Sequence, residues 1–255
     1  MAFQVYHSEP DLYFLKENAY SGLHPNFFNS DDFSWVKELE KNYPQIIAEI
    51  EGLMEGKEEM PPNINPPYLS QPDAWRNFYF FNFRWYDHKN CLRYPKTFAL
   101  IKAIPNVSFA GITVLKPHSK VLPHIGETNA IIRCHLGLKI PGKYLDCGIK
   151  VNGEDRGYHE GKILMFSDAH IHTTWNNTNE KRFLLIIDII QPQFAHKGNW
   201  VCANALAALT LKFVDEKIPI IKLFPNFILS TMRTLLASGW YVYLPIQKQF
   251  VRFYE

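Results

Sequence analysis

Two histidines in this chain stand where a metal could be bound. His124 lies in the segment LPHIGETNAIIRCHLGLKIP, and His172 lies in GKILMFSDAHIHTTWNNTNEKRFLLIIDII. Each is at the edge of an expected β-strand, and each is followed on a strand by an arginine, Arg133 or Arg182. Burying imidazole and guanidinium groups is costly unless they meet a metal or an anion. A small dicarboxylate and an iron ion would supply both.

Strand periodicity places these side chains on shared faces. Alternate residues of a strand point to the same side of the sheet. In the first segment one face carries Asn129, Ile131, Arg133 and His135, so Arg133 and His135 are expected to point together. In the second segment one face carries Arg182, Leu184, Ile186 and Asp188.

The first histidine lacks the acid that usually accompanies it. Non-haem iron sites commonly join two histidines to one carboxylate and leave three positions for co-substrate and O2. Here the expected H-x-D/E motif reads His124-Ile125-Gly126. Asp168 is either a turn residue or a residue that reaches the metal through water. His170 is expected to face the substrate or to be exposed.

Several motifs follow one another along the chain. They are, in order, H-x-G-x-x-N, R-x-H-L-G-L-x-I-P, G-K-x-x-x-F, H-x-x-W and a later R with a D-x-x-x-P ending. Together they resemble the aspartyl/asparaginyl β-hydroxylase family over roughly residues 75–192. Peptide-modifying members of that family hold iron with two histidines and place glycine where the acid would be, so Gly126 agrees with the resemblance.

The resemblance implies an enzyme that is an Fe(II)- and 2-oxoglutarate-dependent dioxygenase and that uses O2 to hydroxylate a C–H bond. Carried over by position, it makes His124 and His172 the iron ligands. Arg182 would pair with the distal carboxylate of 2-oxoglutarate. The co-substrate pocket would be completed by Arg133, His135 and Thr113, and packing and loop geometry would be the roles of Trp175 and Asn129.

The substrate class stays open. The family hydroxylates the β-carbon of aspartyl or asparaginyl residues, whereas the segment VNGEDRGYHEGKILMFSDAHIH also resembles the lipid A hydroxylase branch, which acts on fatty-acyl chains. A peptidyl, lipid or small-molecule substrate is therefore expected. Two alternatives remain: a non-catalytic jelly-roll module that binds a metal or ligand, and a non-haem iron halogenase that accepts chloride beside Gly126.

A mainly β fold is expected to position these residues. From 75 to 192 short β-branched and aromatic runs alternate with turn residues, which is typical of a β-sandwich or barrel. The resemblance makes this core a double-stranded β-helix of the jelly-roll or cupin-like type. We expect an N-terminal helical or irregular wrapper over 1–60, a Pro-rich linker over 61–74 and a C-terminal helical apolar extension over 193–255, all in one compact domain. Asp31 and Asp32 are expected to cap a helix with apolar positions Phe33, Val36, Leu39 and Tyr43.

Composition excludes several other classes. The net charge of +2 over 255 residues, without a run of Lys or Arg, makes nucleic acid a poor partner. The four cysteines lack zinc-site spacing and are expected to be reduced thiols. The absence of a signal peptide or a membrane-spanning run predicts a cytoplasmic protein. Residues 199–255 are expected to form amphipathic helices that pack on the barrel, with Val201, Leu206, Leu209 and Phe213 on one side. Peripheral membrane contact, an oligomer partner or a hydrophobic substrate are the alternatives for that segment.

Overall fold

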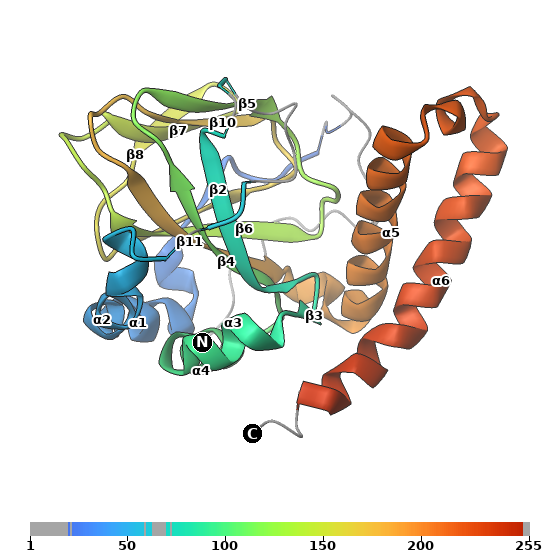
Figure 1. Ribbon diagram of the computed structural model, residues 1–255, viewed down its shortest axis with the longest axis horizontal. Coiled ribbons are helices and arrows are strands. Elements are labelled where there is room, and N and C mark those ends of the chain that lie inside the picture. The colour runs from blue at the N-terminus through green and yellow to red at the C-terminus, as the bar shows by residue number, and fades with distance from the viewer. Residues whose placement is uncertain (1–19, 21, 59, 63–69, 72, 252–255) are drawn as a thin grey trace.

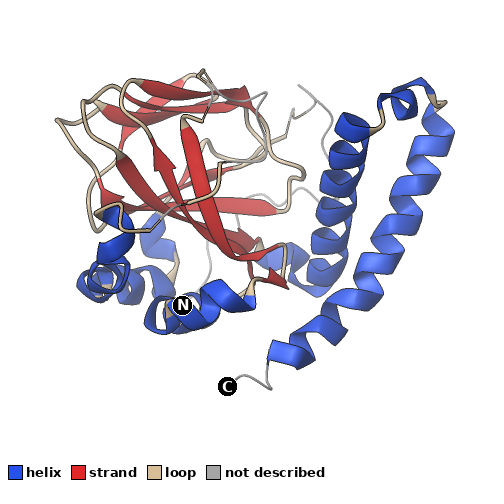
Figure 2. Cartoon of the chain, viewed as in Figure 1, coloured by secondary structure: helices blue, strands red, loops and turns tan. Residues whose placement is uncertain are grey.

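The computed structural model describes residues 20, 22–58, 60–62, 70–71 and 73–251. Their core is a mainly β barrel of two antiparallel sheets that face one another (Figures 1 and 2). The larger sheet has the strand order β1-β9-β6-β11-β4-β2-β3, and the smaller has the order β5-β10-β7-β8. The strands are β1 (Phe27–Phe28), β2 (Trp75–Asn82), β3 (Trp85–Tyr86), β4 (Val107–Leu115), β5 (Ser119–His124), β6 (Ile131–Lys139), β7 (Cys147–Val151), β8 (Glu154–Gly157), β9 (Ile163–Ser167), β10 (His172–Asn176) and β11 (Arg182–Ile190). The expected jelly-roll class is confirmed.

Alternation along the central strands divides the large sheet into two faces. On β6 the even-numbered residues Ile132, Cys134 and Leu136 join the main hydrophobic core. Four helices cover that face: α1 (Ser34–Lys41), α2 (Tyr43–Met54), α3 (His88–Arg93) and α4 (Pro95–Lys102). The odd-numbered residues of β6 face the barrel interior, and Arg133 and His135 both line its cavity. The predicted shared orientation of these two residues is confirmed.

The N-terminal segment combines helices with an edge strand. Strand β1 pairs antiparallel with β9, so the segment completes the large sheet. Val36 and Leu39 of α1 are buried as expected. The predicted cap is wrong: Asp31 and Asp32 belong to a short 3-10 helix, η1 (Ser30–Asp32), whose own N-cap is Asn29. Helix α1 begins one residue after Phe33 and has no side-chain cap.

Parts of the predicted segments lie outside the described residues, namely 1–19, 21 and 59 of the wrapper, 63–69 and 72 of the linker and 252–255 of the extension. Division of the chain near residues 60, 74 and 192 stays a prediction. The four cysteines are buried and free, as expected for reduced thiols.

A helical hairpin stands beside the barrel (Figure 1). It follows a 3-10 helix, η3 (Pro192–Lys197), and consists of α5 (Gly198–Lys217), η4 (Pro219–Leu223) and α6 (Asn226–Val251). Its base shares a small core with the barrel, in which Val201 and Leu206 pack near Phe83 and Ile131. Leu209 is partly buried against this core, whereas Phe213 is 59% exposed. The predicted buried face of α5 is therefore wrong at Phe213, because the helix leaves the barrel before reaching it.

Candidate functional site

The two predicted metal ligands lie opposite each other on neighbouring strands of the smaller sheet. His124 ends β5, His172 begins β10, and the two residues are register partners. Their ring centroids are 4.2 Å apart. The structure therefore brings together two residues that are far apart in the sequence.

Backbone carbonyls orient both rings. The Nδ1 of His124 lies 2.8 Å from the carbonyl oxygen of Leu122, and the Nδ1 of His172 lies 2.8 Å from that of His170. A proton on each Nδ1 would complete these hydrogen bonds and present Nε2 as the electron-pair donor. Metal-bound histidines are usually held this way. Burial lowers the pKa of His124 to about 4 and the pKa of His172 well below its usual value, so both rings stay neutral, as metal ligation requires.

A third side chain reaches the same place from a loop between strands. Asp168 is buried in the turn between β9 and β10, and its Oδ1 lies 3.6 Å from the Nε2 of His172. A Cβ added at Gly126 would lie 1.8 Å from the Oδ2 of Asp168. The Asp168 carboxylate therefore occupies the space that an acid at position 126 would need. This contact explains in physical terms why glycine stands at that point of the motif.

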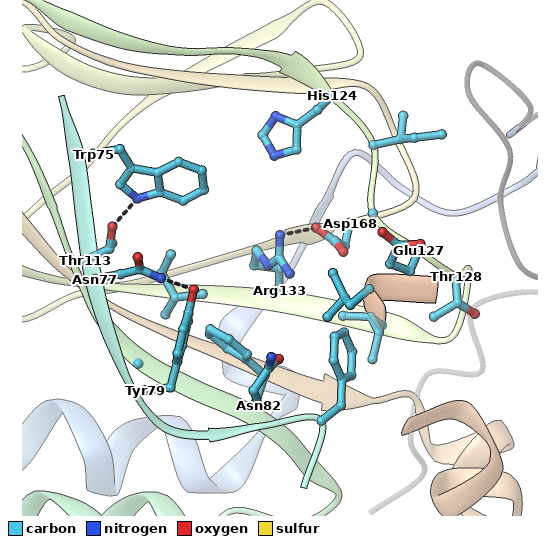
Figure 3. A pocket seen from close by; sticks show the side chains of 18 of the residues that line it. Trp75, Asn77, Tyr79, Asn82, Thr113, His124, Glu127, Thr128, Arg133 and Asp168 are labelled. Carbon is cyan, nitrogen blue, oxygen red and sulfur yellow. Dashed lines mark hydrogen bonds and ion pairs between the residues drawn. The ribbon is translucent and has the colours of Figure 1, made fainter. Parts of the chain in front are cut away.

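Asp168 is also tied to Arg133, as Figure 3 shows. The Nη1 of Arg133 lies 2.6 Å from the Oδ1 of Asp168, and its Nε and Nη2 donate to both carboxylate oxygens of Asp188 at 2.8 and 2.7 Å. Burial raises the pKa of Asp168 to about 7, against the lowering effect of Arg133. Arg133 thus bridges two buried acids, a network that strand parity alone did not reveal, although Asp188 was placed on the face of Arg182.

Arg182 has a different environment. Its side chain is 1% exposed, its Nη1 donates to the Oγ1 of Thr174 at 2.5 Å, and its guanidinium lies 5.3 Å from the ring centre of Tyr158. Within the described residues no acidic side chain forms an ion pair with Arg182, and its Nε has no hydrogen-bond partner. Burial lowers the pKa of this guanidinium. A buried cation without an anion indicates that a ligand supplies the negative charge.

His135 also has a buried polar atom without a hydrogen-bond partner. Its Nδ1 lies 2.9 Å from the hydroxyl oxygen of Tyr158, while its Nε2 is buried without a partner. Burial, with Arg133 and Arg182 nearby, lowers its pKa well below the usual value, so the ring is neutral. The unpaired atoms of Arg182 and His135 belong to residues that line one cavity, the inner cavity, together with Thr113, His172 and Thr174.

A second cavity, the outer pocket of about 130 Å³, adjoins the first because Trp75, Thr113, His124, Arg133 and Ile186 line both. Its wall is largely apolar and aromatic, with Tyr79, Phe83, Phe109, Ile131 and Leu209. Figure 3 shows His124, Arg133 and Asp168 pointing into it. Helix α5 contributes Leu209 and Lys212, so the hairpin forms part of this wall.

Other predicted residues have structural places. Thr113 is buried at the junction of the two cavities and accepts a hydrogen bond from the Nε1 of Trp75. Trp175 donates to the carbonyl of Leu145, and Asn129 is buried with its carbonyl bound by Gln191, in agreement with packing and loop roles. The prediction for His170 is wrong: its side chain is buried, and its Nε2 lies 2.9 Å from the carbonyl oxygen of His24.

The residues of the site could hold a divalent metal and an anionic ligand. Two imidazoles and the nearby Asp168 carboxylate are the groups that face the metal position. Among the described residues no cluster of three or more His, Cys, Asp or Glu side chains is arranged to hold a metal. Two neutral histidines suit Fe(II) and leave positions for further ligands. The unpaired Arg182 and the His135 Nε2 suit the carboxylates of a bound acid.

Comparison with known proteins identifies the family of this chain. The sequence pattern described as aspartyl/asparaginyl beta-hydroxylase matches residues 40–192. An ornithine lipid ester-linked acyl 2-hydroxylase of Rhizobium tropici is 30% identical over 75% of this chain and 70% of its own length. Aspartate beta-hydroxylase domain-containing protein 2 of Xenopus tropicalis is 30% identical over 73% of this chain, which spans about half (52%) of that relative. The human aspartyl/asparaginyl beta-hydroxylase is 29% identical over 62% of this chain and 21% of its own length. The chain belongs to the aspartyl/asparaginyl β-hydroxylase family.

Proposed function

We propose that this protein is an Fe(II)- and 2-oxoglutarate-dependent hydroxylase. The observation that carries the proposal is the pair of unpaired cationic and imidazole groups, Arg182 and His135, in a cavity that also presents His124 and His172. A non-catalytic module has no evident need for a buried guanidinium without an acid, because such a group costs stability when nothing is bound.

In this proposal His124 and His172 hold the iron through Nε2. Arg182 and the hydroxyl of Thr113 or Thr174 fix the distal carboxylate of 2-oxoglutarate, and His135 donates or accepts a hydrogen bond beside the metal end. When bound, iron and 2-oxoglutarate supply the oxidation of a C–H bond by O2, with release of succinate and CO2. The protein's part is to orient these groups and to keep water out of an apolar cavity.

Arg133 and Asp168 have a positioning part. Arg133 holds the Asp168 carboxylate 3.6 Å from the Nε2 of His172, beside the place where the two histidines would hold the iron. Asp188 binds the other side of Arg133 and so fixes the guanidinium that orients Asp168. The predicted contact of Arg133 with the co-substrate stays a prediction.

The outer pocket favours an acyl substrate over an acidic peptide side chain. Its two cationic lining residues are Arg133 and Lys212, and Arg133 is bound to two acids. An aspartyl carboxylate would therefore find little unpaired positive charge, whereas an apolar chain would contact Phe83, Phe109 and Leu209. The reaction proposed is hydroxylation of an acyl chain near its carbonyl group.

The test is an anaerobic titration of Fe(II) with 2-oxoglutarate, followed by the weak visible charge-transfer band of the chelate. The wild type and the exposed-site control His196→Ala should give the band. His172→Ala should abolish it and Arg182→Ala should weaken it. Absence of the band from well-folded wild-type protein would leave the binding-module alternative in place of the oxygenase.

Product mass then distinguishes the remaining chemistry. With an acyl-lipid or an aspartyl-peptide substrate, hydroxylation adds one oxygen atom to one of the two. A chloride-dependent mass increase would favour the halogenase alternative instead.

A further inference from the structure

The helical hairpin lies beyond residues 40–192, which the family pattern matches. Its base is fixed to the barrel: Val201, Leu206 and Leu244 are buried there, and the ring of Trp240 lies 5.7 Å from that of Trp85. Figure 1 shows the turn between α5 and α6 at the end of the hairpin, away from the sheets. The hairpin is therefore a fixed projection with one end uncovered by the barrel.

That end exposes large apolar side chains. Leu223 is 80% exposed, Phe227 71% and Ile220 61%. We call the group the apolar tip, and it comprises Phe213, Ile218, Ile220, Leu223, Phe224 and Phe227. Transfer of such side chains from water to an apolar environment is favourable, so contact with an apolar phase would stabilise the tip. Clustered exposure of this kind marks an interaction surface.

The sequence around the tip has a small excess of positive charge. From 212 to 233 it contains Lys212, Lys217, Lys222 and Arg233, against Asp215 and Glu216. An apolar tip with an excess of positive charge matches the two layers of an anionic membrane surface, where acyl chains lie beneath negatively charged headgroups. A symmetric contact with a second copy would instead bring this positive charge toward its own equivalent.

The side of the hairpin offers further apolar surface. An open groove of about 590 Å³ runs between α5 and α6 and is lined by residues that include Leu211, Val214, Leu236 and Trp240. A Cβ added at Gly239 would meet no atom within 4 Å, so the groove is open there. Tyr241 and Tyr243 are each 47% exposed further along α6. Tyrosine and tryptophan are enriched where membranes meet water.

We propose that the α5–α6 hairpin docks this protein on anionic membrane surfaces, with the apolar tip among the acyl chains and the exposed Lys217 at the headgroups. No helix in the described part of the chain combines the length and apolarity needed to cross a bilayer, so contact is with one surface. The opposite side of α5 lines the outer pocket through Leu209 and Lys212. Docking would therefore hold the pocket close to the lipid.

The test is flotation of the full chain with vesicles, without iron or 2-oxoglutarate. One set contains phosphatidylglycerol and phosphatidylcholine, and the other contains phosphatidylcholine alone. The wild type should float with the anionic set and much less with the neutral set. The double variant Leu223→Ser, Phe227→Ser should bind at least about tenfold more weakly. Leu92→Ser changes a leucine of α3 that is 57% exposed on the barrel, and it should float like the wild type.

Light scattering after size-exclusion chromatography measures the oligomeric state and can contradict the proposal. If the wild type floats with neither vesicle set and forms a dimer, and the double variant is a monomer, the tip is a contact between copies and the proposal fails. A monomer that ignores both sets also overturns it. The Fe(II)–2-oxoglutarate band of the double variant should equal that of the wild type, so failure of docking is distinguishable from failure of the proposed oxygenase function.

Discussion

The barrel interior and the tip of the hairpin depart in opposite ways from the usual distribution of residues, in which charged groups are exposed and large apolar groups are buried. The barrel buries a guanidinium, that of Arg182, which is 1% exposed and has no acid beside it in the described residues, whereas the hairpin exposes Leu223 to 80%. Each arrangement costs free energy in the isolated protein. We therefore infer a different partner for each region: a small anion that enters the cavity of the barrel, and an extended apolar phase that covers the tip of the hairpin.

The two arginines that point into the barrel differ in whether an acidic side chain binds them. Arg133 is held by Asp168 and Asp188, while Arg182 has a neutral hydroxyl and an aromatic ring. The Arg133 guanidinium is therefore bound within the folded protein, and the Arg182 guanidinium is the one that we propose for a ligand. Substitutions at the two sites should therefore separate stability from binding.

The largest loss of stability is expected for Asp188→Asn. Asp188 is fully buried and binds Arg133 through both carboxylate oxygens. Removing one partner of a buried ion pair costs about 3–5 kcal/mol. Denaturant unfolding should show this decrease in the free energy of unfolding. Glu180→Gln, which changes an exposed partner of Lys139, is the matched control and should cost at most about 1 kcal/mol. A loss below that value for Asp188→Asn would mean that Arg133 is solvated.

A smaller and opposite effect is expected for Arg182→Met. Methionine fills similar space without a charge, so the free energy of unfolding of the ligand-free protein should stay the same or increase. Affinity for 2-oxoglutarate in the presence of Fe(II) should fall roughly 10- to 100-fold, because a charge-assisted contact is worth about 1.5–3 kcal/mol. Calorimetric titration measures the affinity. Strong destabilisation without any change in affinity would assign Arg182 to the framework.

Strand periodicity predicted much of this site and could not predict the rest. It placed Arg133 with His135, and Arg182 with Asp188, because a two-residue period needs only local sequence. The position of Asp168 depends on how the turn after β9 packs against Gly126, which is distant in the sequence. The exposure of Phe213 likewise depends on where the barrel ends beneath α5. Contacts between distant segments decide both.

The third prediction concerns how the free energy of unfolding depends on pH through a buried imidazole, that of His135. Burial lowers the pKa of His135 well below the value near 6.5 that imidazole has in the unfolded chain. As pH falls below 6.5 the unfolded chain binds a proton that the folded protein does not, so this histidine makes stability decrease toward acid pH. Its contribution is about 1.4 kcal/mol per pH unit. His124 and His172 act in the same direction, whereas Asp168, with its pKa raised to about 7, acts in the opposite one.

His135→Gln isolates this contribution. In metal-free protein the free energy of unfolding of the variant should depend less steeply on pH between about 5 and 6.5 than that of the wild type. Chemical denaturation at several pH values measures the two slopes. Equal slopes would show that His135 is protonated in the folded protein, and the cavity would then carry one more cation than we infer.

The smallest effect is expected at the apolar tip. Leu223→Ser should change the free energy of unfolding by no more than about 0.5 kcal/mol, because the side chain is already in water. Leu206→Ala, on the buried face of the same hairpin, should cost about 2–5 kcal/mol. Thermal and denaturant unfolding of both variants tests the difference. If Leu223→Ser were as costly as Leu206→Ala, the tip would be covered within the folded protein, and its exposed leucine would no longer need a membrane to explain it.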